Sequence, residues 1–343
     1  MYGKVNVIDP EFFNMDQLVK VNRKIKQNIA SFEDVNTKPI KFFIPKNSST
    51  RRVLKYPNLF SYCKLVDKIV KSKEQEISIL CKDKNSLSRF FNISPYTYNS
   101  AIQMRDQKLI GFTRFYKTDF SNFYPSFYTH AIPWLIEDKV FAKTHKRNMH
   151  YLGNRLDRLL QMSQDGETNG VPTGNIITRI IMELCMAKFD SRLRLALGNE
   201  VNFARYVDDI YFGFNNDKEL LKIKTTINEL ASQYNLTLNN SKCSSITYLE
   251  IDNSSKLIDY FDNRQINFSN EEKIAKQLNN FYLVARDEIL SGVKGTDKLI
   301  FTSLRYFIEN LEKENIEIFL KGLIYSSENG KGFIDKLMQL VIL

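Results

Sequence analysis

The segment Arg205-Tyr206-Val207-Asp208-Asp209 decides how this sequence is interpreted. Two short apolar stretches, residues 201–205 and 210–214, flank the turn, and we expect them to pair as a β-hairpin. Adjacent aspartates at a tight turn repel each other unless a cation lies between them. Magnesium suits this place, because it prefers hard oxygen ligands and keeps positions for water and substrate phosphates. Taken alone, the aspartate pair also fits an ordinary polar hairpin turn.

A third carboxylate favours the metal interpretation. Asp119 follows a strand-like stretch at residues 111–118, and we expect it on a strand next to the hairpin. Asp119, Asp208 and Asp209 could then hold two magnesium ions, with manganese as an alternative. One ion would lower the pKa of an attacking hydroxyl, and the other would stabilise the leaving pyrophosphate.

The predicted elements around these aspartates indicate an α+β fold. After the strand at 111–118 we expect a long helix at 175–197, the two hairpin strands, a helix at 217–234 and a strand at 236–238. This order of strand, helix, two strands, helix, strand is the ferredoxin-like split βαβ topology. Polymerase palms use it, and so do many unrelated proteins, so the fold alone does not decide the function.

Composition points to a polyanionic partner in an intracellular setting. The chain has 343 residues, a formal net charge of +10 and a sequence pI near 9.2, which favours nucleic acid or nucleoside triphosphates as ligands. The four cysteines are scattered, so we expect free thiols. Neither a signal-peptide core nor an apolar run of bilayer length is visible, and we therefore expect a soluble, cytoplasmic protein.

Other elements are expected on both sides of the central region. Upstream we expect a helix at 16–29, a hairpin formed by 41–44 and 52–54, and mixed helix over 62–91. Within the centre we expect a short helix after Pro125 and another helix at 151–162. Downstream we expect four helices, at 271–289, 298–312, 316–325 and 333–343. The last apolar run has no cap, so we expect the natural protein to continue past Leu343.

Several segments, in order over residues 41–242, resemble the motifs of the reverse-transcriptase family. Residues 205–209 are similar to its paired-aspartate motif, and residues 119–126 are similar to its first-aspartate motif. Gly170-Val171-Pro172-Thr173-Gly174, at the start of a helix, resembles the third motif. Ile44-Pro45-Lys46 and Arg52-Val53-Leu54 resemble the fingers hairpin, and residues 236–242 resemble a motif whose lysine approaches the leaving phosphate.

The resemblance implies roles for individual side chains. Tyr124 would be the steric gate against a 2′-hydroxyl, since a buried ring offers an extra oxygen no partner. Lys46 and Arg52 would clamp the triphosphate, and Lys242 would be a general acid for pyrophosphate. Further nucleotide contacts are implied for Phe120, Pro172 and Gly174, and Phe120 is also assigned to the metal site. Ordinary roles remain as alternatives: a core aromatic for Tyr124, a helix-starting turn for residues 170–174, and solvated cations for Lys46, Arg52 and Lys242.

Several short sequence segments are more specifically similar to the bacterial abortive-infection reverse transcriptases of the AbiK type. These are residues 44–47, 57–59, 121–124, 128–130, 132–134, 170–175, 179–181 and 183–184. The resemblance implies an α+β fold with fingers and a ferredoxin-like palm, followed by an α-helical C-terminal region in place of a thumb. Residues 1–115 would form the N-terminal segment and fingers, 116–268 the palm with a helical fingers insertion near 131–168, and 269–343 the start of the helical domain.

That family implies an unusual polymerase. Its members make DNA from dNTPs without a template, prime synthesis on a tyrosine of the protein, and act as homo-oligomers in anti-phage defence. Tyr2 matches the region of the priming tyrosine, with Tyr56, Tyr96 and Tyr98 as rivals, and the single-stranded DNA product would be covalently attached. Thr173, where most templated members carry glutamine, weakens the case for template reading. The alternatives are a templated, retron-like or intron-like reverse transcriptase and a palm-shaped nucleic-acid-binding module without catalysis.

Overall fold

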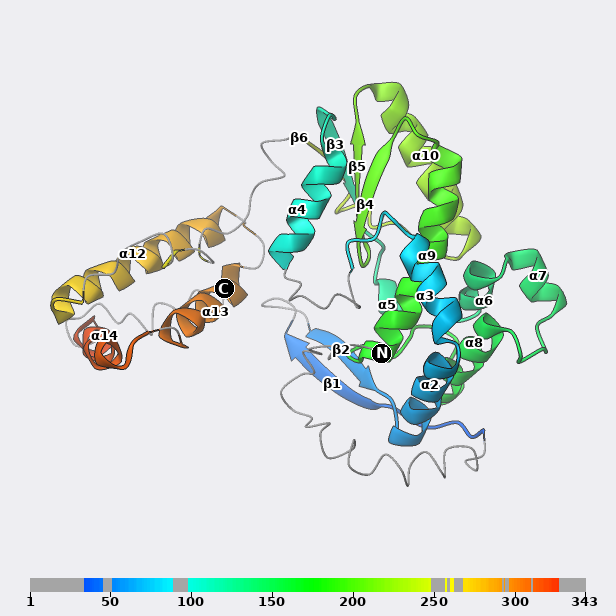
Figure 1. Ribbon diagram of the computed structural model, residues 1–343, viewed down its shortest axis with the longest axis horizontal. Coiled ribbons are helices and arrows are strands. Elements are labelled where there is room, and N and C mark those ends of the chain that lie inside the picture. The colour runs from blue at the N-terminus through cyan, green and yellow to red at the C-terminus, as the bar shows by residue number, and fades with distance from the viewer. Residues whose placement is uncertain are drawn as a thin grey trace. The chain divides into compact units, whose positions relative to one another are not determined.

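The computed structural model describes residues 34–45, 51–88, 98–247, 257, 260–261, 268–291, 293, 296–309 and 311–326. The chain divides into two compact units: the first includes the described residues up to 247, and the second includes those from 257 onward (Figure 1). The helix expected at 16–29 and the one expected at 333–343 lie outside the described residues. Within the described part, no helix combines the length and the apolar character needed to cross a membrane.

The first unit is built on a four-stranded antiparallel sheet with the order β4-β5-β3-β6. Its strands are β3 (Arg114–Thr118), β4 (Asn202–Tyr206), β5 (Asp209–Phe214) and β6 (Ser244–Thr247). The crossover elements include α9 (Ile176–Leu197) and α10 (Asp217–Gln233). This is the strand order of a ferredoxin-like split βαβ, as the sequence predicts.

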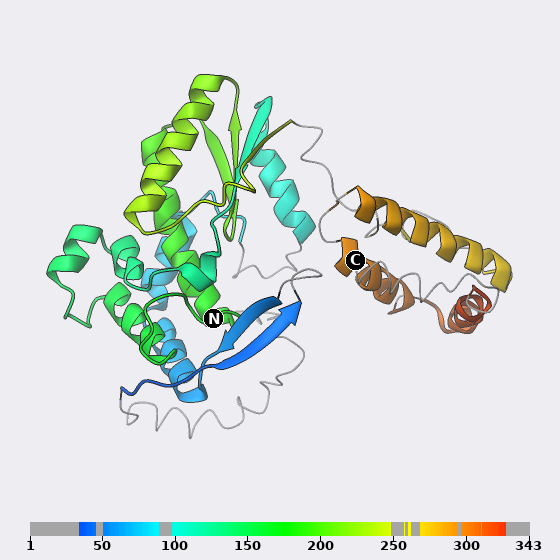
Figure 2. The same cartoon turned by 180° about the vertical axis from the view of Figure 1, so that it is seen from behind.

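Alternation along β4 explains how the sheet is covered. Phe203 belongs to the large core that includes α9 and α10, whereas Ala204 packs in a separate cluster with Leu87 and Ala101. Ala101 lies on α4 (Tyr98–Leu109). Successive side chains of a strand point to opposite faces, so Phe203 and Ala204 contact different layers of the unit. Figures 1 and 2 show α9 and α10 on one side of the sheet and α4 on the other. Arg205, the next residue, therefore faces α9.

Two expectations about this region are wrong in detail. The fourth strand is β6 rather than residues 236–238, where Leu238 forms only an isolated bridge with Phe120. Leu236 and Leu238 are buried in the core, so their alternation reflects packing rather than a strand. The short helix α5 (Phe123–Ser126) begins before Pro125, since proline is tolerated throughout a first helical turn.

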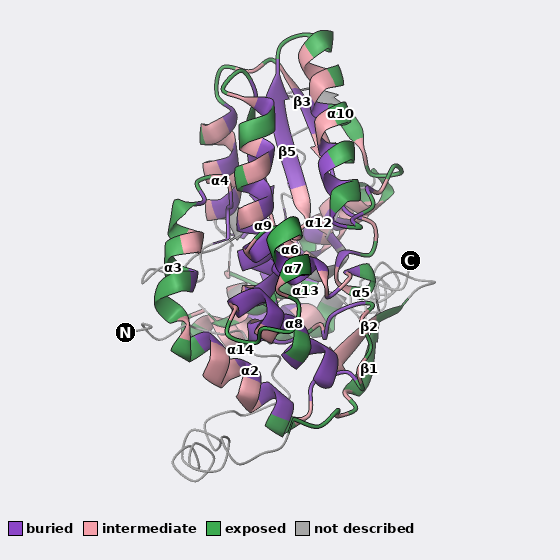
Figure 3. Ribbon diagram, turned by 90° about the vertical axis from the view of Figure 1, so that its right-hand side faces the viewer, coloured by how far each residue is buried: buried purple, intermediate pink, exposed green. Residues whose placement is uncertain are grey.

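Among the described residues, the other regular elements of the first unit are one hairpin and several helices. Strands β1 (Ile40–Pro45) and β2 (Arg51–Tyr56) pair antiparallel, which confirms the hairpin expected there. The remaining helices are α2 (Leu59–Lys71), α3 (Lys73–Lys82), α6 (Ala131–Ile136), α7 (Lys139–Thr144) and α8 (Leu152–Met162). Strands β3, β4 and β5 are mostly buried (Figure 3), whereas residues 40–44 of β1 are exposed and the helices expose their outer faces.

The second unit contains three described helices, α12 (Glu271–Leu290), α13 (Thr296–Glu309) and α14 (Lys313–Ser326). They confirm three of the four helices expected after residue 270. An aromatic cluster forms the core, with the Phe261 ring stacked on Phe281 at 5.0 Å and on Phe307 at 4.3 Å between centroids.

The four cysteines of the chain, all in the first unit, are free, which matches the expectation of unpaired thiols.

Candidate active site

The predicted aspartate pair lies at the turn between β4 and β5. Tyr206 pairs with Asp209 across the hairpin, so that Val207 and Asp208 form a two-residue turn. Val207 has a φ of 58°, in the left-handed region that a β-branched side chain rarely enters. Such a conformation persists only where the surroundings enforce it. The Nη1 atom of Arg205 donates a hydrogen bond of 2.9 Å to the Val207 carbonyl and is one such constraint.

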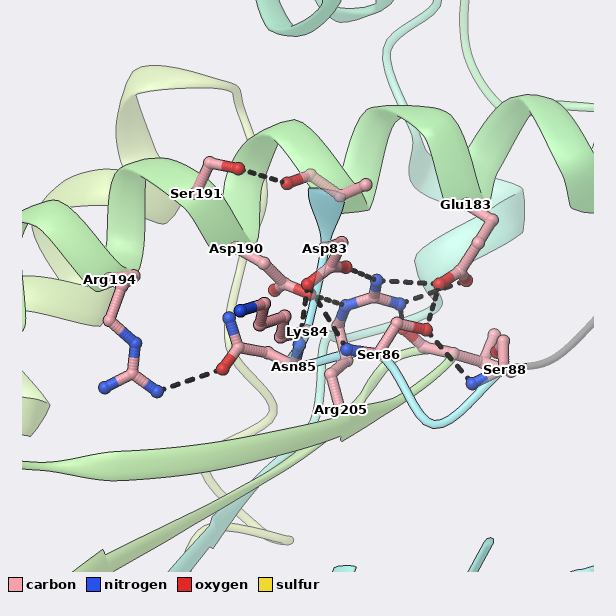
Figure 4. Close-up of polar contacts among 12 residues, drawn as sticks. Asp83, Lys84, Asn85, Ser86, Ser88, Glu183, Asp190, Ser191, Arg194 and Arg205 are labelled. Carbon is pink, nitrogen blue, oxygen red and sulfur yellow. Dashed lines mark hydrogen bonds and ion pairs between the residues drawn. The ribbon is translucent and has the colours of Figure 1, made fainter. Parts of the chain in front are cut away.

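Arg205 is the centre of a buried ionic network directly under this turn. It is 0% exposed, and its guanidinium donates to Asp190 at 2.7 Å and to both oxygens of Glu183 at 2.8 and 3.1 Å (Figure 4). A longer contact of 3.4 Å reaches Asp83, in the loop after α3. Because Glu183 and Asp190 lie on α9, the network ties the end of β4 to that helix. The sequence motif contains Arg205 but gives no sign of these partners.

Burial and charge shift the pKa values of two members of this network. Burial raises the pKa of Asp190 well above its usual range; Arg205 opposes this shift, and the neighbouring Asp83 adds to it. Coulombic attraction from Asp190 and Glu183 outweighs burial and raises the pKa of Arg205. The guanidinium thus remains charged between α9 and the turn.

Asp119 lies next to the aspartate turn, as predicted. It follows β3, whose last residue, Thr118, pairs with Ile210 of β5. Its carboxyl is 2% exposed; Lys242 Nζ donates to one oxygen, while the other, Oδ1, is buried without a hydrogen-bond partner. The backbone N–H of Asn239 donates to the Asp119 carbonyl at 2.8 Å. The backbone of residues 239–242 therefore places Lys242 next to Asp119.

The electrostatics show that the three aspartates share one neighbourhood. Burial, followed by the proximity of Asp119 and then of Asp209, raises the pKa of Asp208 to about 7. The hydrogen bond with Asp119 raises the pKa of Lys242, and all three carboxylates contribute to that shift. Asp209 pairs with Lys117 Nζ at 3.1 Å. Burial alone would lower the pKa of Lys117, but Tyr211 and Asp209 raise it.

These carboxylates fit a divalent cation, although the described residues contain no preassembled group of three or more metal-ligating side chains. Two lysines pair with two of the carboxylates, Lys242 with Asp119 and Lys117 with Asp209. Lys242 reaches only one oxygen of Asp119, and the other, Oδ1, is buried beside Asp208 without a hydrogen-bond donor. A buried carboxylate oxygen without a donor carries a desolvation cost that a bound cation would offset. The donor set is the one that magnesium prefers.

Tyr124 lies beside the aspartates. Burial first, and then the charge of Asp208, raises the pKa of its hydroxyl. The backbone around it is held by the 170–174 loop: Val171 N–H donates to the Tyr124 carbonyl at 2.9 Å, and Gly170 N–H donates to the Phe127 carbonyl at 2.9 Å. Gly170 has a φ of 80°, and a Cβ there would lie 2.6 Å from the Pro125 carbonyl oxygen. Only glycine allows this close approach.

The same loop connects the site to the β1–β2 hairpin. Thr173 Oγ1 donates to the Val53 carbonyl at 3.1 Å, and Lys55 N–H donates to the Thr173 carbonyl at 3.0 Å. Gly174 has a φ of 100° and faces Leu54. Asn175, the N-cap of α9, accepts from Thr178 N–H at 2.9 Å. The sequence departure at Thr173 is therefore a structural link between the loop and β2.

The other predicted site residues divide into three groups. Arg52 lies exposed on β2, opposite Ile44, and Pro172 is buried in the loop. Phe120 is 2% exposed, with its ring against Phe123 and Phe189, so its side chain belongs to the core. Lys46 and Tyr2 lie outside the described residues. The roles assigned to all these side chains stay predictions.

Comparison with known families agrees with the site. The model of the family described as reverse transcriptase (RNA-dependent DNA polymerase) matches residues 44–284, more than half of the chain. Fold and carboxylates thus point to a nucleotidyltransferase-type protein, and the chain belongs to the reverse transcriptase family. No curated protein matches this sequence.

Solved structures with detectable similarity include fungal telomerases. Apo telomerase from Candida tropicalis has a TM-score of 0.47 and 15% identity, over 96% of this chain and 68% of that chain. The same telomerase truncated from its C-terminal domain has a TM-score of 0.43 and 16% identity, over 68% of this chain and 56% of that chain. Telomerase from Candida albicans, in complex with the TWJ fragment of telomeric RNA, has a TM-score of 0.45 and 13% identity, over 95% of this chain and 64% of that chain.

Proposed function

We propose that this protein is a DNA polymerase that transfers nucleotides from dNTPs with Asp119, Asp208 and Asp209 as its metal ligands. The observation that carries the proposal is the buried, unpartnered Oδ1 of Asp119 beside Asp208. Bound magnesium would supply an activated attacking hydroxyl and stabilisation of the leaving pyrophosphate. Lys242 neutralises Asp119, and its raised pKa keeps it a cation that can donate a proton to the leaving group.

The remaining residues would orient the nucleotide. Tyr124 would be the steric gate, a role supported by its partly buried position near Asp208. Gly174 and Pro172 would let the nucleotide approach the start of α9, where the helix N-terminus favours phosphate. Lys46 and Arg52 would hold the triphosphate from the hairpin, and Phe120 would contribute at the metal and nucleotide sites through its backbone, since its side chain is buried.

We further propose that the chain is of the abortive-infection, AbiK type. Synthesis would be template-independent and protein-primed from Tyr2, the product single-stranded DNA would stay attached to the protein, and the enzyme would be a homo-oligomer in anti-phage defence. The motif strings support this branch, and so does Thr173, whose hydroxyl is engaged by Val53. A tyrosine hydroxyl is a chemically suitable primer once activated.

The proposed division of the chain follows the same family. Residues 1–115 would form the N-terminal segment and fingers, 116–268 the palm with a helical insertion near 131–168, and 269–343 the start of a helical domain in place of a thumb. The four-stranded sheet within 114–247 and the helices α12 to α14 support this division. A templated reverse transcriptase of the retron or intron kind is the second candidate, favoured by the family match itself.

One experiment separates these functions. The purified protein is incubated with magnesium and labelled dNTPs, without template or primer, and resolved on a denaturing gel. We expect a labelled band of protein plus DNA, and its loss in Tyr2→Phe. Incorporation only after addition of an RNA template and a primer would support the templated candidate instead. No incorporation under either condition would favour a non-catalytic module that binds nucleic acid.

A further inference from the structure

A second charged site lies on the first unit, away from the aspartates. A cavity of about 740 Å³ opens between two walls. One wall is α2, and the other is formed by α8 and the loop that joins α7 to α8. Figures 1 and 3 show α2 and α8 close together at one end of the unit, with the four-stranded sheet towards the other. None of the residues that line this cavity belongs to the candidate active site.

Cations line both walls of this cavity, which we call the α2–α8 cleft. Five lysine or arginine side chains face two aspartates there, namely Lys64, Lys68, Lys71, Arg147 and Arg155 against Asp34 and Asp67. The three lysines follow α2 at spacings of four and three residues, so they lie one above another at successive turns. A row of cations along a helix matches a chain of negative charges better than a single anion.

Two of the cations are available for a ligand. Asp34 is shared by Lys64 at 2.8 Å and Arg155 at 2.9 Å, and these hydrogen bonds, with Arg155 first, lower the pKa of Asp34 to about 2. Lys71 pairs with Asp67 at 2.6 Å, an exposed pair of little strength. Among the described residues no ion pair engages Lys68 or Arg147, one on each wall of the cleft, although the charge of Lys68 also acts on the pKa of Glu76.

The wall that carries Arg147 is held in place. The side chain of Asn154, on α8, donates to the His145 and Asn148 carbonyls at 2.9 Å each, and Asn148 accepts from His150 N–H at 3.0 Å. The His145 ring stacks on Phe141 at 4.2 Å. This loop is therefore ordered before any ligand arrives, which lowers the entropic cost of binding.

The lining also has an apolar part. Met149 is 41% exposed at the rim, and Leu159 lies at the base of the cleft. A flexible thioether adapts to different flat surfaces. Nucleic acid offers both parts at once, phosphates for the cations and bases for the apolar surface.

We propose that the α2–α8 cleft binds the phosphodiester backbone of single-stranded nucleic acid, at a site separate from the three aspartates. The proposal goes beyond the polymerase function, because it requires neither metal nor catalysis. Lys68 and Arg147 contact the phosphates, and the Asp34 clamp keeps the two walls together. A free nucleoside triphosphate shares the phosphate chemistry but spans too few charges to use the whole row.

Binding is measured by fluorescence anisotropy with labelled oligodeoxythymidylates of 4, 8 and 16 nucleotides, in EDTA so that catalysis plays no part. We compare the wild type, Lys68→Ala/Arg147→Ala and the matched control Lys218→Ala/Lys276→Ala, which removes two exposed cations elsewhere. Lys68→Gln/Arg147→Gln repeats the test with longer side chains, and circular dichroism verifies the fold of each variant.

We expect the cleft variants to bind the 16-mer at least about tenfold more weakly, with a slope of log K against log salt reduced by roughly 1.4, for two lost phosphate contacts. The control should bind like the wild type, and affinity should rise with oligonucleotide length. Equal binding by the cleft variants and the control would overturn the proposal. It would also be overturned if dTTP competed as effectively as the 16-mer, because the site would then be a mononucleotide pocket.

Discussion

Replacement of Arg205 tests whether the buried network supports the aspartate turn. Arg205→Leu removes a guanidinium that is 0% exposed and bonded to Asp83, Glu183 and Asp190. Loss of one partner from a buried ionic group costs about 3–5 kcal/mol, because the remaining charges stay buried without compensation. For a unit of this size, that corresponds to a fall in Tm of roughly 6–20 °C.

The measurement is thermal unfolding, followed by circular dichroism and calorimetry, at neutral pH. Arg205→Lys keeps the charge but loses the planar fork, and we expect an intermediate loss of about 1–3 kcal/mol. Arg114→Leu is the matched control, since Arg114 pairs with Asp217 at 2.7 Å on the surface and should cost at most about 1 kcal/mol. If Arg205→Leu were as stable as this control, the network would not hold the turn.

Further predictions concern stability elsewhere in the first unit. Burial raises the pKa of Glu76 to about 7 against the hydrogen bond from Ser72, so the folded protein binds an extra proton and loses stability as pH rises from about 4.5 to 7. Glu76→Gln should be more stable than the wild type by about 1–3 kcal/mol at pH 8 and equal to it at pH 4 in urea unfolding; the same difference at both pH values would refute this. Gly170→Ala should lose roughly 1–3 kcal/mol, whereas Gly198→Ala, with a φ of 74° and nothing within 4 Å of its Cβ, should lose less. Equal losses would show that contact with Pro125 does not matter.

The sequence predicts the parts of the fold that have strong local signals. The β4–β5 hairpin and α9 follow from local pattern, and Asn175 at the start of α9 is a favourable N-cap. The sequence does not predict the edge strand β6, because Ser244-Ser245-Ile246-Thr247 has little apolar alternation, while Leu236 and Leu238 imitate it. Strand propensity depends on such tertiary contacts.

The same limit applies to the site. Asp119 could be assigned to the aspartate pair because each lies at a strand end that the topology brings together. The partners of Arg205 could not be predicted from the sequence, because Asp83 is 122 residues away along the chain and Glu183 is 22 residues away. Nothing in the sequence marks Lys117 either, although it pairs with Asp209. Only the register of β3 against β5 places its side chain there.

Nucleotide incorporation by Asp208→Asn tests the central claim, that the three carboxylates together bind the metal that drives nucleotidyl transfer. The variant changes one carboxyl oxygen to an amide and should keep the fold, as measured by circular dichroism. With magnesium and labelled dNTPs we expect its incorporation to fall at least ~100-fold, because a metal ligand is lost. Asp217→Asn, an exposed carboxylate outside the site, should incorporate like the wild type. Undiminished incorporation by Asp208→Asn would contradict the metal assignment.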